Sequence, residues 1–143
     1  MLDIVEIMKR IPHRYPFLLV DRILEMDKET KTVRGIKNVT MNEAHFEGHF
    51  PGHPIMPGVM IIESMAQCLG VLVMDDIEGG TKLPYFAGID SAKFKRPVRP
   101  GDQLVYEVRV EKQKLSIVKA HGIAKVDGEL ACEATFTFSL VGK

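Results

Sequence analysis

The feature that most constrains the fold of this chain is a long apolar segment, Val59 to Met74, which follows a loop dense in proline and glycine. Its apolar residues fall on two adjacent ridges at helical spacing: Ile61, Met65, Leu69 and Val73, then Ile62, Ala66, Gly70 and Met74. A helix that is apolar on nearly all sides is buried within a protein. The segment is too short, and with Glu63 and Gln67 too polar, to span a bilayer. The sequence therefore predicts one central buried helix.

The chain ahead of this helix is interrupted by residues that break regular structure: Gly48, Pro51, Gly52, Pro54, Pro57 and Gly58. Such a density of breakers predicts a loop with a fixed and unusual path. A proline in such a loop leaves open whether the peptide bond before Pro54 is cis or trans.

The N-terminal part predicts one short helix and two strands. Asp3 and Glu6 have the spacing of a capping box, and the helix that they start is expected to end at Pro12. Phe17–Met26 and Thr32–Thr40 are the strand candidates.

The C-terminal part predicts roughly four more strands. One lies within Tyr85–Val98, after a polar segment at Asp75–Lys82, and the next follows a turn at 99–102. Asp127-Gly128 is a strong signal for a two-residue hairpin. Alternating apolar residues give each later strand one buried face, and Leu130 is counted on that face. We therefore expect an α+β fold in which an antiparallel sheet wraps around the one long central helix.

Composition bounds the function classes. The 143 residues suit a single domain covering 1–143. Nineteen cations balance nineteen anions, which argues against bulk nucleic-acid binding and makes self-association easy. Cys68 and Cys132 form no CxxC pair, and the first residues carry early acids without a long apolar run. These features predict a cytoplasmic protein without a signal peptide.

Three histidines, His45, His49 and His53, are spaced four residues apart in the loop. On a helix that spacing would present a metal-binding face, but the intervening breakers prevent a helix, so no metal site is expected. The ordinary alternative is that each histidine is satisfied by the backbone of the loop.

Glu63 is the sharper anomaly, because it stands in the first half of a helix that is otherwise apolar. Glutamate is rarely buried without a partner, and desolvation predicts a raised pKa for its carboxyl group. A carboxyl group that stays protonated near neutral pH can act as a general acid. Gln67 lies one turn later on the same face and can hydrogen-bond Glu63. The alternative is that Glu63 only faces a cleft or an interface.

The helix start adds a third element. Pro57-Gly58 leads into the first turn, where free backbone N–H groups and the positive end of the dipole gather. The segment thus offers a base (His49), an acid (Glu63) and an oxyanion donor (the N–H of Gly58). That set suits β-elimination of water from a 3-hydroxyacyl thioester, a reaction that needs neither metal nor organic cofactor.

The same residues resemble a known family. The segments P12-H-R-Y-P-F-L-L-V-D-R22, G48-H-F-P-G-H-P-I-M-P-G-V59 and E63-S-M-A-Q67, with F86-A-G-I-D and R96-P-V-R-P-G-D102, closely resemble the bacterial 3-hydroxyacyl-[acyl-carrier-protein] dehydratases of the FabZ type. The resemblance covers nearly the whole chain in order. It implies a hot-dog fold and dehydration of (3R)-3-hydroxyacyl-[acyl-carrier-protein] to the trans-2-enoyl form in fatty-acid synthesis.

The resemblance also implies roles and an assembly. His49 becomes the catalytic histidine and Glu63 the catalytic acid, contributed by opposite subunits of a homodimer that often forms a trimer of dimers. Gly58 matches the oxyanion position, and Gln67 the residue that orients the acid. A related dehydratase–isomerase class has aspartate at the position of Glu63, so glutamate favours the plain dehydratase.

The substrate of this family arrives on acyl carrier protein, which is acidic. The chain has a short basic run without an acid among its members: Lys93, Lys95, Arg96 and Arg99. Such a run can attract an acidic partner, although it can also be a solvated strand edge.

Apolar residues near the helix either line an acyl tunnel or form plain core: Ile62, Met65, Phe86 and Phe94. His13 and Arg14 are expected only to brace a loop.

Two other functions stay open on the residues alone. A hot-dog thioesterase would hydrolyse the thioester with a positioned water and commonly a carboxylate base. A non-catalytic acyl-binding module would have no activity to lose when His49 or Glu63 is replaced.

Overall fold

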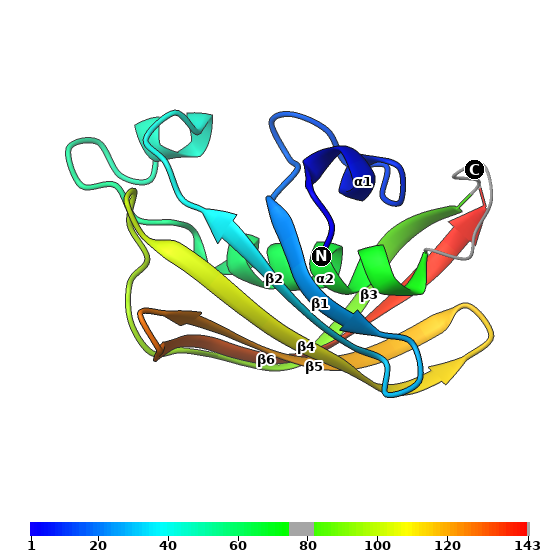
Figure 1. The fold of residues 1–143 in the computed structure, drawn as a ribbon. Helices are drawn as coiled ribbons and strands as arrows, with labels where there is room; N and C mark the ends of the chain where they lie inside the picture. The colour runs from blue at the N-terminus through cyan, green and yellow to red at the C-terminus, as the bar shows by residue number, and fades with distance from the viewer. Residues whose placement is uncertain (75–81, 143) are drawn as a thin grey trace.

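A strongly curved antiparallel sheet wraps around helix α2 (Gly58–Val73), as Figure 1 shows. The computed structural model describes residues 1–74 and 82–142. The six strands run in the order β1-β2-β4-β5-β6-β3. Their bounds are β1 Arg22–Asp27, β2 Thr32–Asn38, β3 Lys82–Phe94, β4 Gln103–Lys114, β5 Ile117–Val126 and β6 Glu129–Gly142. Helix α1 (Ile4–Met8) and the 3-10 helix η1 (Ala44–Glu47) complete the elements. The α+β prediction, with one long helix inside an antiparallel sheet, is confirmed.

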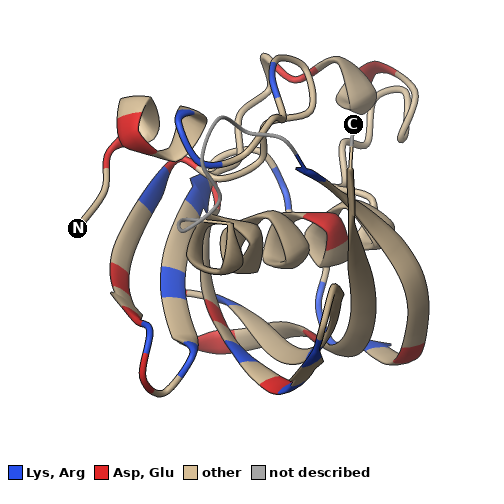
Figure 2. Cartoon of the chain, turned by 90° about the vertical axis from the view of Figure 1, so that its right-hand side faces the viewer, with Lys and Arg blue, Asp and Glu red and all other residues tan. Residues whose placement is uncertain are grey.

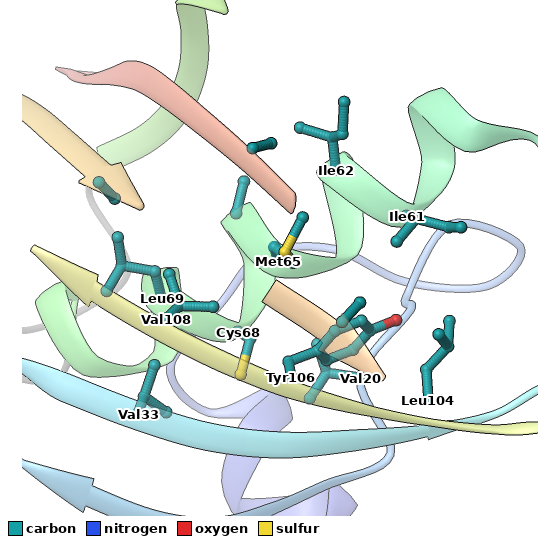
Figure 3. Close-up of a cluster of buried hydrophobic side chains, with 14 of the residues drawn as sticks. Val20, Val33, Ile61, Ile62, Met65, Cys68, Leu69, Leu104, Tyr106 and Val108 are labelled. Atoms are coloured by element: carbon teal, nitrogen blue, oxygen red, sulfur yellow. The ribbon is translucent and has the colours of Figure 1, made fainter. Parts of the chain in front are cut away.

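Helix α2 is buried because almost every side chain on it is apolar. Figure 3 shows Cys68 and Leu69 lying against Tyr106 and Val108 of β4. Met65 and Leu69 are fully buried, and each such side chain stabilises the fold by roughly 2 kcal/mol through removal from water. Gly35 of β2 allows close approach, because a Cβ there would lie 2.7 Å from the sulfur of Cys68. The predicted helix boundaries agree with the observed ones to within one residue.

The later strands follow the predicted alternation with one difference. Asp127 and Gly128 both have positive φ angles, 50° and 79°, as the mirror-image hairpin turn requires. Just beyond this turn, a β-bulge between β5 and β6 shifts the register beside Lys125. Ala131 is therefore buried, and Leu130, which was expected on the inner face, is only half-buried.

The N-terminal elements are shorter than predicted. Asp3 caps α1 by accepting from the N–H of Glu6 at 3.0 Å, but the helix ends at Met8 rather than at Pro12. The first strand begins at Arg22, not at Phe17, because Gln67 of α2 takes up backbone groups of the segment ahead of it. Strand β2 ends at Asn38, two residues before the predicted end at Thr40. Except for Lys82, which begins β3, the polar segment predicted at 75–82 lies outside the described residues.

Strand β3 forms one edge of the sheet and pairs, among the described strands, with β6. Four large apolar side chains on it are exposed: Tyr85, Phe86, Ile89 and Phe94. An exposed apolar edge strand is a template for pairing with another chain. Within residues 1–74 and 82–142, no helix is long and apolar enough to cross a membrane.

Candidate active site

His49 lies in the loop between η1 and α2, and backbone hydrogen bonds fix the loop around it. Its N–H donates to the carbonyl of His45 at 3.1 Å, and its own carbonyl accepts from Ile55 at 3.0 Å. On the side chain, Nδ1 lies 2.7 Å from the carbonyl oxygen of Ile55. A carbonyl oxygen can only accept, so Nδ1 carries the proton of the neutral ring. Nε2 then keeps its lone pair and can take a proton.

A buried ion pair anchors the start of the loop that carries His49. Lys37 at the end of β2 places Nζ 2.7 Å from the carboxylate of Glu43, and both side chains are largely buried. Glu43 also accepts from the N–H of Thr40 at 2.9 Å and is the N-cap residue of helix η1. The sequence did not single out this pair. The alternation of β2 places Lys37 on the same face as Val33 and Gly35, which are both buried, but a lysine at that position gave no sign of its partner in the sequence.

The other two loop histidines have different surroundings. Burial lowers the pKa of His45, whose Nε2 has no hydrogen-bond partner among the described residues. His53 is exposed, and its Nε2 accepts from Arg99 at 3.4 Å. In the described part of the chain, no three His, Cys, Asp or Glu side chains are grouped closely enough to hold a metal ion.

His49 opens into a groove of about 490 Å³ at the first turn of α2. Gly58 and Val59 of that turn line one wall, and Phe94 and Lys95 at the end of β3 line the other. Pro57 is the N-cap and brings no side-chain cap to this end of the helix, so the first N–H groups are available to a ligand. A Cβ at Gly58 would lie 2.6 Å from the ring of Phe94. Any larger residue would displace that ring.

Glu63 is the one charged residue of α2, and Figure 2 shows a single acidic band on that helix. Its side chain is 18% exposed, and burial raises the pKa of its carboxyl group. The hydrogen bond from Gln67 at 2.8 Å opposes that shift without reversing its direction. The carboxyl group is therefore protonated up to a higher pH than an exposed glutamate.

Gln67 is 1% exposed and uses its whole amide group. Its Oε1 accepts from the N–H of Leu19 at 2.8 Å, and its Nε2 donates to the carbonyl of Phe17 and to Oε2 of Glu63, both at 2.8 Å. Because the N–H of Leu19 can only donate, the orientation of the amide is fixed. Gln67 thus connects Glu63 rigidly to the segment ahead of β1.

His13 is a site residue that the sequence reasoning missed. Its Nε2 lies 3.6 Å from Oε2 of Glu63, and its side chain is 15% exposed. The guanidinium of Arg14 donates to three carbonyl groups, those of Met8, Ile11 and His13, and so braces the turn that presents the ring. No spacing in the sequence links residue 13 to residue 63. The only available signal was a histidine inside a motif of the resembled family.

Within one chain the candidate base and the candidate acid do not share a cavity. Glu63 lines a small pocket of about 10 Å³ with His13 and Gln67, whereas His49 lines the larger groove. Strand β3 reaches both sites: Pro84 and Phe86 contact the Glu63 pocket, and Phe94 contacts the groove.

The basic run lies at the mouth of the groove, where Lys95 and Arg96 line the wall. Arg96 is already paired, at 3.1 Å with Glu129 and at 3.7 Å with Asp102. Lys93 and Lys95 form no ion pair with the described residues.

The four apolar residues that could line a tunnel divide into two pairs. Ile62 and Met65 are buried in the core, and Phe86 and Phe94 are exposed beside the two cavities.

The curved sheet around one central helix, with polar groups at its ends, defines a hot-dog-fold protein. A solved dehydratase heterocomplex from Xenorhabdus doucetiae has the same fold, with a TM-score of 0.82, 17% identity and coverage of 96% of this chain and 91% of that one. A hypothetical thioesterase protein with coenzyme A from Streptococcus pneumoniae also resembles it, with a TM-score of 0.62, 15% identity and coverage of 85% and 86%. At these identities the likenesses show the fold alone.

Sequence comparison assigns the family. The FabA-like domain family matches residues 11–135. A relative from Fusobacterium nucleatum, named 3-hydroxyacyl-[acyl-carrier-protein] dehydratase FabZ, is 68% identical over 138 residues, which cover 96% of each chain. A relative of the same name from Bacillus pumilus is 56% identical over 140 residues, covering 98% of this chain and 96% of that one. The chain belongs to the FabA-like domain family and, within it, to the FabZ-type dehydratases.

Proposed function

We propose that this chain removes water from 3-hydroxyacyl-[acyl-carrier-protein] to form the trans-2-enoyl product. His49 acts as the base and Glu63 as the acid. The relatives named for this reaction, at 68% and 56% identity over nearly the whole chain, support the substrate and the reaction type.

The observation that carries the proposal is that the surroundings of His49 and Glu63 favour two unlike proton-transfer states, an acceptor and a donor. The carbonyl of Ile55 holds the proton of His49 on Nδ1, so Nε2 can accept a proton. Burial raises the pKa of Glu63, which favours the protonated carboxyl group that can donate one. An elimination needs one group in each state at the same pH.

The chemistry follows from these two states. Nε2 of His49 takes the α-proton while charge develops on the thioester oxygen, and the N–H of Gly58 stabilises that oxygen. Glu63 donates its proton to the 3-hydroxyl group, which leaves as water as the C–O bond breaks. The proton on His49 returns to Glu63 through solvent, which restores both groups. Every step uses side chains and backbone groups of the protein itself.

The two separate cavities support a site shared between two copies of the chain. If the exposed edges of β3 pair antiparallel, the Pro84 end of one copy lies beside the Phe94 end of the other. These two ends are roughly 30 Å apart along one strand. Such pairing sets the Glu63 pocket of each copy against the His49 groove of its partner. A two-fold arrangement of this kind produces two equivalent sites and can assemble further into a trimer of dimers.

Mixed assemblies test the shared site. His49→Ala and Glu63→Ala chains are unfolded together, refolded, and compared with each variant alone. A heterodimer has one intact site, so random mixing returns about a quarter of the parental activity. The absence of recovery, with heterodimers verified by differently tagged chains, would contradict the shared site.

The reaction type is tested by incubating the protein with a 3-hydroxyacyl carrier substrate. Release of free thiol, without an enoyl product that absorbs in the ultraviolet, would contradict dehydration itself.

The basic run Lys93, Lys95, Arg96 and Arg99 is proposed to meet the acidic carrier at the mouth of the groove. Because Arg96 is already paired, Lys93→Glu plus Arg99→Glu is the informative variant. Its KM for carrier-bound substrate rises, while the kinetics on a small thioester analogue stay close to those of the parent. Lys112→Glu plus Lys114→Glu, at the exposed end of β4, is the charge-matched control. Equal damage on both substrates would argue against docking.

A cytoplasmic location is also proposed. Cys68 and Cys132 are both free and buried, as expected in a reducing compartment. A carrier-bound substrate also requires that the enzyme and its carrier share one compartment. A fluorescent fusion that localises outside the cytoplasm would overturn this assignment.

A further inference from the structure

The Glu63 pocket is also lined by His13, a polar side chain to which the proposed mechanism gives no role. Three elements meet there: α2 contributes Glu63 and Gln67, the segment after α1 contributes His13, and β3 and β6 contribute apolar groups. Those apolar groups are Pro84, Phe86 and Phe138, none of which titrates. The polar surroundings of the carboxyl group are therefore the amide of Gln67 and the imidazole of His13.

Both polar groups approach the same oxygen. Nε2 of Gln67 lies 2.8 Å from Oε2 of Glu63, and Nε2 of His13 lies 3.6 Å from that atom. The amide nitrogen of Gln67 can only donate, and its orientation is fixed by the N–H of Leu19. Oε2 is thus an acceptor, and the acidic proton of the carboxyl group belongs on Oε1.

The tautomer of His13 agrees with that arrangement. Nδ1 of His13 is buried without a hydrogen-bond partner among the described residues. A buried N–H without a partner is rarer than a buried acceptor without one, so the proton of the neutral ring is on Nε2. Burial and the neighbouring charge of Arg14 lower the pKa of His13, which keeps the ring neutral. The nitrogen that lies 3.6 Å from Oε2 therefore carries a hydrogen that it can donate.

From this geometry we infer that His13 is a positioning residue which, together with Gln67, holds the acid proton of Glu63 on Oε1, the oxygen left for the substrate hydroxyl group. Gln67 supplies the short hydrogen bond. His13 supplies a second donor that tightens when substrate closes the site, as catalytic hydrogen bonds commonly do. The inference rests on the proposed dehydratase function.

Two substitutions separate the donor from the ring. His13→Phe keeps a ring that can stack on Phe17, as His13 does at 6.5 Å, but it removes the donor. His13→Gln removes the ring and places an amide N–H close to the former position of Nε2. Arg14 is left intact in both variants, so the bracing of the turn is preserved.

The assay is kcat and KM for dehydration across pH, with the parent, both variants and Gln113→Leu, an exposed surface control. We expect His13→Phe to lower kcat by about 10-fold with little change in KM, the effect of one donor lost in the transition state. Loss of a donor to the carboxylate also raises the pKa of Glu63, so the alkaline limb of the pH–rate profile moves to higher pH. His13→Gln should recover most of kcat and return the limb toward that of the parent.

The outcomes are decisive in each direction. The inference would be overturned if His13→Phe kept the kcat of the parent and the same alkaline limb in its pH–rate profile. It would also be overturned if His13→Phe and His13→Gln lost kcat equally. A parent that forms no enoyl product would instead contradict the proposed function. The pKa of Glu63 followed by carboxyl carbon NMR, in the parent and in His13→Phe, then tests the donor without turnover. An unchanged pKa there would overturn the inference.

Discussion

The His49 loop and the Glu63 pocket place their reactive groups by opposite means. The loop is held by backbone hydrogen bonds, such as those that join His49 to His45 and Ile55, and it opens into a groove of about 490 Å³. The pocket is held by one fully used side chain, Gln67, and encloses only about 10 Å³. Backbone bonds leave the imidazole exposed enough to take a proton. Burial raises the pKa of the carboxyl group and so favours its protonated form, which makes the two roles in proton transfer a consequence of the two kinds of support.

The largest expected effect is the loss of kcat when a reactive group is removed, compared with removal of a neighbouring side chain. His49→Ala and Glu63→Ala should each lower kcat by about 10³-fold, because each removes one proton-transfer group. His53→Ala in the same loop and Glu47→Ala at the end of η1, both at exposed positions, are matched controls that should keep most of the activity. Steady-state kinetics check this. A loss in His53→Ala as large as that in His49→Ala would break the comparison on the loop side.

The ion pair at the start of the loop gives the next effect. Lys37→Met leaves the buried carboxylate of Glu43 without its partner and should lower the free energy of unfolding by about 3 kcal/mol. Urea denaturation measures the change. The double variant Lys37→Met plus Glu43→Leu should recover much of it, and the exposed Lys114→Met should be neutral. A neutral Lys37→Met would show that backbone bonds alone hold the loop.

Gln67 tests the pocket side of the comparison. Gln67→Leu leaves the N–H of Leu19 and the carbonyl of Phe17 unpaired in a buried place, at a cost of about 2 kcal/mol in unfolding free energy. It also removes the donor to Glu63, so kcat should fall with it. Gln113→Leu on the exposed end of β4 is the matched control. Full activity in a stably folded Gln67→Leu would mean that Glu63 is positioned without it.

The smallest effect is the pH dependence of stability. The raised pKa of Glu63 means that the folded state binds more protons than the unfolded state above the ordinary value of 4.5. Stability contributed by this group should therefore fall as pH rises from that value through the raised pKa. Glu63→Gln should flatten this part of the profile in denaturant titrations. An unchanged slope in that variant would assign the dependence to another group.

Much of the fold could be predicted because its elements carry local signals. The apolar ridges predicted α2 to within one residue, and Asp127-Gly128 predicted the hairpin. The first strand was predicted too early, since Phe17 and Leu19 bond to Gln67 instead of to a neighbouring strand. Pattern alone does not reveal a distant side chain that competes for backbone groups.

The site divides in the same way. Glu63 and Gln67 lie one turn apart on one helix, so their hydrogen bond could be expected from spacing. The approach of His13 to Glu63 joins residues whose separation in the sequence carries no period, and so does the pairing of Lys37 with Glu43. Such contacts depend on how the segment after α1 and the end of β2 pack, and no local pattern encodes that.

By itself the sequence determined a buried helix that carries one acid and a loop ahead of it that carries a histidine. It also determined the resemblance to the FabZ-type dehydratases. The tertiary structure decided that His49 and Glu63 face different cavities of one chain, and that the exposed strand β3 contacts both. The physical reason is that periodicity fixes which face of an element is apolar, whereas the position of each face in space follows from packing across the whole sheet.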